Sequence, residues 1–156
     1  MPVVEVVTPL SNLARIVADI NAASWDEANE ISGYDVEALH AYLQCQDTVF
    51  LVCRDEDDPE TFLGMASGRL QLKPHGQERW FYVDEVDVCV DQRRKGAGAA
   101  MMRKFLAIAY EHDCEELWLG TEIDNEAANG LYRSLKPDDI EQFTGFNFEM
   151  KNQDTD

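Results

Sequence analysis

A short, basic, glycine-containing turn constrains the fold of this chain more than any other segment. The turn, Arg93-Arg94-Lys95-Gly96-Ala97-Gly98, separates a strand-like run, Trp80 to Cys89, from a helical run over about Gly96 to Glu111. Backbone N–H groups at such a junction can point at one anion, and glycines let the anion approach without a Cβ clash. Three of the thirteen basic residues lie here. The turn therefore predicts an anion site between a strand and a helix.

Strand-like and helical runs alternate along the rest of the chain. Residues of high β propensity predict further strands at Val3–Val7, Thr48–Cys53, Phe62–Leu72, Leu117–Leu119 and Gln142–Met150. Helical spacing predicts helices over Leu10–Ile20 with Thr8 and Pro9 at the start, over Val36–Leu43 with Asp35 as N-cap, and over Asn125–Leu135. This order predicts an α/β fold, a mixed central β-sheet with helices on both faces.

Length and charge limit the classes of function. The chain has 156 residues, enough for one domain, which we expect over residues 1–150 with a polar tail at 151–156. Thirty-one acidic and thirteen basic residues give a net charge of −18, which repels nucleic acids and anionic membrane surfaces. We therefore expect neither as a partner. A cationic partner fits this charge, although a surface adapted for solubility or for high salt explains it equally well.

Targeting signals and metal-ligand patterns are both missing from the sequence. Polar residues and prolines interrupt the first twenty positions, and no apolar run reaches the length of a membrane span. Cys45, Cys53, Cys89 and Cys114 form no C-x-x-C pair, and the three histidines are scattered. We expect a soluble cytoplasmic protein with buried free thiols and no metal.

Two segments carry a resemblance to a known family. The turn is neither a Walker A loop nor a Rossmann fingerprint, and it resembles the R-x-x-G-x-G/A coenzyme A signature of GNAT acetyltransferases. The segment NEAANGLYRSL, Asn125 to Leu135, resembles their second signature, N-x-x-A-x-x-L-Y. The resemblance implies a GNAT fold with acetyl-CoA as cosubstrate. Alone, Asn125 reads as a helix cap and Tyr132 as a core tyrosine.

The resemblance also implies roles for single residues. It implies that residues 93–98 (Arg93, Arg94, Lys95, Gly96, Ala97 and Gly98) hold the pyrophosphate and that Val88 and Asn125 contact the pantetheine arm. It places Tyr132 at the thioester sulfur, where its phenol can protonate the departing thiolate.

The stretches Tyr82–Val88 and Glu141–Phe146 most resemble the aminoglycoside 3-N-acetyltransferase branch, which implies a homodimer and makes Glu85 the base. Asp84 can share that role, Asp87 is a third carboxylate closer to the turn, and a bulge would change which of them faces the acceptor.

The acceptor side is less constrained. We expect direct transfer, without an acyl-enzyme, to a primary amine of an aminoglycoside antibiotic. Candidate ligands for its ammonium groups are Asp26, Glu30, Glu122, Glu126 and Glu141, each of which also reads as solvated surface. Trp25 and Tyr34 suit either a sugar ring or the core. The alternatives are a polyamine, another small amine or a protein N-terminus as acceptor, and a non-catalytic CoA-binding regulatory module.

Overall fold

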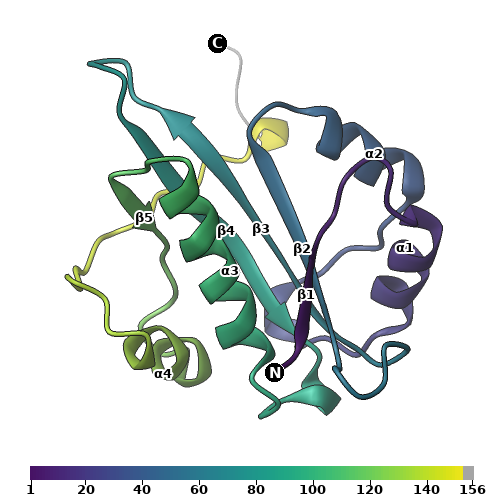
Figure 1. Cartoon of the computed structure of the whole chain (residues 1–156). Coiled ribbons are helices and arrows are strands. Elements are labelled where there is room, and N and C mark those ends of the chain that lie inside the picture. Colours follow the sequence, from purple (N-terminus) through teal and green to yellow (C-terminus); the bar gives the residue numbers. More distant parts are fainter. Residues whose placement is uncertain (153–156) are drawn as a thin grey trace.

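The computed structural model describes residues 1–152 and contains one five-stranded sheet in the order β1-β2-β3-β4-β5 (Figure 1). The strands are β1 (Val3–Val6), β2 (Thr48–Arg54), β3 (Phe62–Leu72), β4 (Arg79–Val88) and β5 (Glu116–Trp118). Neighbouring strands from β1 to β4 run antiparallel, while β4 and β5 run parallel. The expected mixed sheet is confirmed.

Helices cover both faces of this sheet. They are α1 (Leu13–Ala22), α2 (Val36–Gln44), α3 (Ala97–Glu111) and α4 (Glu126–Ser134), with short 3-10 turns η1 (Glu27–Asn29), η2 (Val90–Gln92) and η3 (Met150–Asn152). Phe81 and Phe105 centre the core beneath α3, and Ile16 and Ile20 of α1 centre the core on the opposite face. Within residues 1–152, every helix is too short or too polar to cross a membrane.

Three of the four expected helix starts are correct, including that of α3, whose N-cap is Gly96. Asp35 and Asn125 cap α2 and α4 by accepting hydrogen bonds from the N–H groups of Ala38 and Ala128. The start at Thr8 and Pro9 is wrong, because Asn12 caps α1 by accepting from the N–H of Arg15. The Thr8 oxygens accept instead from the N–H groups of the two residues that close a preceding turn, Leu10 and Ser11.

The last expected strand, Gln142–Met150, is also wrong. Residues 142–149 form no strand, although Phe146 and Phe148 alternate with polar residues as a strand would. Both rings are largely exposed, and Phe143 packs on Trp118 at 5.7 Å between ring centroids. The adjacent edge strand β5 is only three residues long, so it offers little ladder to pair with. Lys151 of the expected tail belongs to η3, and residues 153–156 lie outside the described part.

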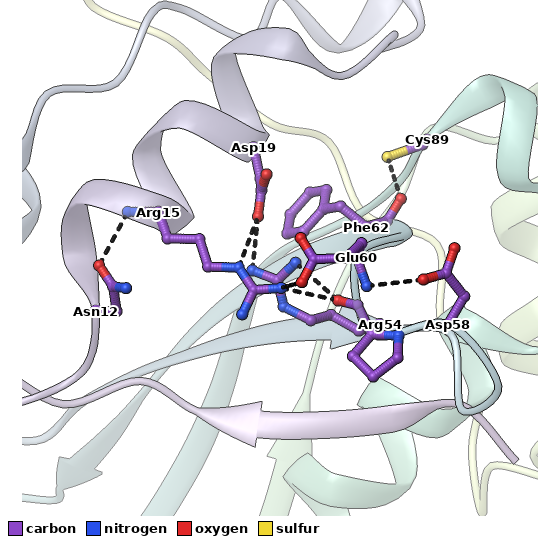
Figure 2. Close-up of polar contacts among 9 residues, drawn as sticks. Asn12, Arg15, Asp19, Arg54, Asp58, Glu60, Phe62 and Cys89 are labelled. Atoms are coloured by element: carbon purple, nitrogen blue, oxygen red, sulfur yellow. Dashed lines mark hydrogen bonds and ion pairs between the residues drawn. The ribbon is translucent and has the colours of Figure 1, made fainter.

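Two arginines fasten α1 to the end of the sheet. Figure 2 shows Arg15 from α1 and Arg54 from β2 lying together beside Asp19 and Glu60. Both guanidinium groups donate to the Pro59 carbonyl oxygen in the β2–β3 loop, at 3.1 and 3.4 Å. Arg15 also pairs with Glu60 at 3.0 Å, and Arg54 pairs with Asp19 of α1 at 2.7 Å. These bonds set the position of α1 and of the segment, residues 23–35, that follows it.

Candidate active site

A bulge in β4 decides which face of the sheet its later carboxylates lie on. Glu85 lies opposite Ser67 of β3 and Val83 lies opposite Gly68, so Asp84 has no partner residue on β3. Beyond the bulge, Asp87 lies opposite Met65, which belongs to the core under α1 and α2. Because side chains alternate along a strand, Glu85 and Asp87 both face α1 and α2, whereas Val86 and Val88 pack toward α3.

Asp84 is held in an ion pair beside this face. Its Oδ1 accepts a hydrogen bond from Nη1 of Arg69 at 2.9 Å. The same guanidinium lies over the ring of Tyr82, 5.0 Å from its centroid. The charge of Asp84 is therefore already paired, which leaves Glu85 as the exposed carboxylate of this strand without a basic partner within residues 1–152.

Asp87 is the one buried charged or polar side chain of the described residues, with 6% of its surface exposed. Its Oδ1 accepts a hydrogen bond from the side-chain amide of Asn29 at 3.1 Å. Burial, and then the charge of Glu85, raises the pKa of Asp87 from 3.8 to about 6. The sequence signal for this site is a third carboxylate, after Asp84 and Glu85, near the end of a strand-like run.

Tyr132 approaches the same region from α4. The ring packs against the core under α3. Burial, and then the charge of Asp87, raises the pKa of Tyr132 to about 12. The phenol therefore stays protonated at neutral pH and can donate a hydrogen bond or a proton.

The basic turn adopts the backbone of an anion site. Arg94 and Gly96 are left-handed, with φ of 67° and 81°, and Gly96 is the N-cap of α3. The first N–H groups of a helix have no partner within it, so those of α3 are available to a ligand at this turn. Nη2 of Arg93 lies 3.2 Å from Asp26, and Nζ of Lys95 lies 3.6 Å from Asp55. Two of the three basic side chains of the turn, Arg93 and Lys95, are thus paired with acidic residues.

Gly98 serves helix packing. A Cβ at this position would lie 2.8 Å from Cδ2 of Leu131 in α4. The missing side chain lets α3 and α4 approach closely, and so helps to place Tyr132, the neighbour of Leu131. Within the turn, Gly96 rather than Gly98 supplies the left-handed backbone.

The two residues expected at the pantetheine arm lie at the ends of β4 and before α4. Val88 is the last residue of β4, whose pairing with β5 covers only Trp80–Tyr82, so the later residues of this β4 edge have no strand partner within residues 1–152. The side-chain oxygen of Asn125 caps α4, as noted above. Its contact with a cofactor stays a prediction.

The five expected acceptor ligands fall into two groups. Asp26 and Glu30 flank η1, and Asp26 pairs with Arg93 of the turn. The other three lie around α4: Glu122, Glu126 and Glu141. Glu141 lines a cavity of about 470 Å³ between α3, α4 and β5 that includes Tyr132 but none of the β4 carboxylates. The structure therefore does not bring the five together with Glu85.

The two expected aromatic residues are core contacts. Trp25 packs edge-on against Phe62 at 6.1 Å and donates its indole N–H to the Ile20 carbonyl oxygen. Tyr34 packs on Phe50 at 6.2 Å. Of the four cysteines, Cys53 and Cys89 are buried as expected, but Cys45 is exposed at the end of α2.

Comparison with known proteins tests the resemblance. Residues 15–136, which span α1 to the end of α4, match the Acetyltransferase (GNAT) family. The chain belongs to the GNAT family. Membership of the GNAT family implies acetyl-CoA as the cosubstrate, and the chain shows the family's α/β fold. The curated proteins contain no significant match to it.

Solved structures resemble the GNAT chain over nearly its whole length. An aminoglycoside acetyltransferase from an uncultured soil metagenomic sample, in complex with sisomicin, matches with TM-score 0.80 and 19% identity, covering 96% of each chain. A second aminoglycoside acetyltransferase from such a sample matches with TM-score 0.75 and 16% identity, covering 96% of this chain and 99% of that one. The ribosomal-protein-alanine N-acetyltransferase of Brucella melitensis biovar Abortus 2308 matches with TM-score 0.70 and 18% identity, covering 94% and 99%. At these identities the likeness is one of fold.

Proposed function

We propose that this GNAT chain transfers the acetyl group of acetyl-CoA to a primary amine of an aminoglycoside antibiotic, the 3-amino group, and so confers resistance. The observation that carries the proposal is the β4 bulge, which turns Glu85 and Asp87 toward the α1 and α2 side of the strand that leads into the basic turn. An amine needs a nearby carboxylate to lose its proton before it can attack a thioester. This arrangement supplies negative charge for the acceptor beside positive charge for the donor.

The proposed donor side uses the turn and the edge of β4. The pyrophosphate binds the cations and N–H groups of residues 93–98, and displaces Asp26 from Arg93 and Asp55 from Lys95. The unpaired edge of β4 up to Val88 can hydrogen-bond the amides of pantetheine, as an added strand would. Asn125 supports the same arm from the start of α4.

The proposed reaction is direct. A β4 carboxylate, Glu85 with Asp84 beside it, takes one proton from the acceptor ammonium, and the free amine nitrogen then bonds to the thioester carbon. As the C–S bond breaks, its electron pair leaves on sulfur, which takes the phenol proton of Tyr132. The nitrogen returns its second proton to the phenolate, so that the amide, the thiol and one released proton remain.

The nearest cysteine supports transfer without an acyl-enzyme. Cys89 follows β4 directly and is buried, and burial raises the pKa of its thiol to about 12. A thiol that stays protonated is a poor nucleophile. Direct attack by the amine in a ternary complex therefore suits this site better than a cysteine intermediate.

An aminoglycoside is preferred over the other acceptors on two grounds. The net charge of −18 suits a polycation, and two of the structural neighbours are aminoglycoside acetyltransferases. A polyamine, another small amine and a protein N-terminus remain alternatives, as does a non-catalytic CoA-binding regulatory module. The test is mass spectrometry and NMR of a gentamicin-type antibiotic after incubation with protein and acetyl-CoA. One acetyl group on the 3-amino nitrogen supports the proposal, and an unmodified antibiotic contradicts it.

We further propose that the protein is a homodimer. Phe146, Phe148 and Met150 are exposed beside a three-residue edge strand, β5. Apolar side chains exposed in a row are typical of an interface, and a second copy of the chain would cover them. Light scattering after gel filtration tests this: we expect a dimer that Phe146→Glu dissociates, whereas a wild-type monomer contradicts the proposal.

A further inference from the structure

A second carboxylate, Asp87, follows Glu85 by two residues in the regular part of β4, on the same face of the strand and nearer the turn. Asp87 has 6% of its surface exposed, whereas Glu85 is exposed. Residues two apart on a strand point to the same side. Glu85 therefore lies at the open end of this face and Asp87 at its inner end.

The contacts of Asp87 leave half of its carboxylate unused. Asn29, from the η1 turn between α1 and α2, donates its side-chain amide to Oδ1 at 3.1 Å. Within residues 1–152, Oδ2 accepts no hydrogen bond and makes no ion pair. In the described part of the chain, Trp80 Nε1 is the one side-chain nitrogen or oxygen that is both fully enclosed and without a partner. Oδ2 of Asp87 has no partner there but is not fully enclosed. This oxygen is therefore free to meet a ligand at the inner end of the site.

Titratable groups surround Asp87 on both the acceptor and the donor side. Glu85 on β4 and Tyr34 before α2 lie on the acceptor side, and Tyr132 on α4 lies on the donor side. Along β4 the next residue on this face is Cys89, a protonated thiol, and β3 presents Met65. The charge of Asp87 raises the pKa of both Tyr34 and Tyr132. The charge of Glu85 raises the pKa of Tyr34 but not that of Tyr132. Asp87 is thus the β4 acid between the two sides.

We propose that the β4 carboxylate that takes the proton from the acceptor ammonium is Asp87, through its Oδ2, while Glu85 holds the ammonium beside it in place of acting as the base, and that Asn29 is the positioning residue of Asp87. The inference rests on the proposed function. One N–H bond of the ammonium breaks and one O–H bond forms on Asp87. Its proton passes to solvent after the amide leaves, and the thiolate takes its proton from Tyr132 as before.

The shifted pKa of Asp87, about 6, supports this role. A carboxyl group with that pKa is ionised at pH 7 and is a stronger base than one with an ordinary pKa. Exposed Glu85 then attracts the cation at the mouth of the site.

The test is the pH dependence of kcat/KM for Asp87→Asn, measured by thiol release with an aminoglycoside. In the wild-type protein we expect kcat/KM to fall as the pH is lowered, with the midpoint of this acidic limb near pH 6, where Asp87 becomes protonated. In the variant we expect kcat to fall by about 100-fold or more, the limb to disappear, and the Kd of acetyl-CoA to stay within about twofold. The matched control Glu111→Gln removes one charge from the exposed end of α3 and should retain the wild-type profile.

Asn29→Ala gives a second readout that does not depend on how Asp87→Asn folds. Loss of a donor to a carboxylate raises its pKa, so the acidic limb should move to higher pH while activity at pH 9 is retained. An unimpaired Asp87→Asn with the wild-type limb overturns this role alone. A wild-type protein that acetylates no amine overturns the proposed function, and this role with it.

Discussion

Nη2 of Arg93 lies 3.2 Å from Oδ2 of Asp26. Arg93 is the first residue of the basic turn, and Asp26 is the N-cap of η1. The pair joins the proposed donor site to the segment that follows α1. The Val90 N–H donates to the Ser24 carbonyl oxygen and Asn29 donates to Asp87, so this segment meets the end of β4 at three points. A phosphorylated ligand at the turn must compete with Asp26 for Arg93.

Replacement of Asp26 by Asn should therefore strengthen the binding of acetyl-CoA. Asn keeps the N-cap bond to the Ala28 N–H but removes the competing charge. An exposed ion pair is weak and screened by salt, so the Kd should fall by only roughly 1.5- to 5-fold, and only at low salt. Isothermal titration calorimetry measures this change, with Glu111→Gln as the control of equal charge. Equal or weaker binding by Asp26→Asn contradicts this reading of the turn.

The two glycines of the turn should fail in different ways. Gly98→Ala brings a Cβ to 2.8 Å from Cδ2 of Leu131, so this side chain must turn away and disturb Tyr132 beside it; kcat should therefore fall while the Kd of acetyl-CoA changes little. Gly96→Val strains a left-handed backbone at the phosphate site, so the loss should appear mainly in the Kd of acetyl-CoA. The control is Gly76→Ala, where a Cβ meets open space. If Gly98→Ala and Gly96→Val changed kcat and the Kd of acetyl-CoA to the same extent, the two glycines would not have the different roles proposed for them.

Tyr132→Phe tests the proton donor to the leaving thiolate. The substitution keeps the ring in the core under α3 and removes only the O–H. We expect kcat to fall by about 10- to 100-fold with the Kd of acetyl-CoA unchanged. Tyr110→Phe, at an exposed position of α3, is the control. Wild-type kcat for Tyr132→Phe would remove the phenol from the mechanism.

The raised pKa of Asp87 also predicts how stability depends on pH. As the pH rises from about 4 to 6, the unfolded chain releases the proton of Asp87 before the folded chain does, because the folded pKa is about 6 instead of 3.8. Stability therefore falls over this window. The free energy of unfolding of the wild-type protein, minus that of Asp87→Asn, should decrease by about 1–2 kcal/mol. Urea unfolding at several pH values measures it, and a constant difference contradicts the assignment.

Most elements of the fold follow from local sequence signals. Strand β3 has the expected bounds, and Asp35 and Asn125 cap the expected helices, because cap chemistry and alternation act over a few residues. The start of α1 was misplaced because the Thr8 oxygens have a competing turn to bond. The strand expected at Gln142–Met150 does not form, because a strand needs a neighbouring strand to pair with and β5 is only three residues long. The sequence of residues 142–150 carries no information about the length of β5.

The site was predictable in part for the same reason. The turn at residues 93–98 is continuous in sequence, so its residue types alone predict a glycine turn that opens a helix, as the structure has it. The register of β4 was open, because a bulge depends on how β3 pairs with it. The contact of Asn29 with Asp87 and the pairing of Asp26 with Arg93 join distant segments. No local pattern contains these contacts, and the role of Asp26 at the acceptor stays a prediction.

The most direct test of the central claim is the initial rate of thiol release from acetyl-CoA with three acceptors in parallel: a gentamicin-type aminoglycoside, spermidine and a peptide with a free N-terminus. The account predicts rapid release with the aminoglycoside, little with the other two, and a loss of turnover in Glu85→Gln far greater than its loss of cofactor affinity. Robust release with the peptide and none with the aminoglycoside would contradict it.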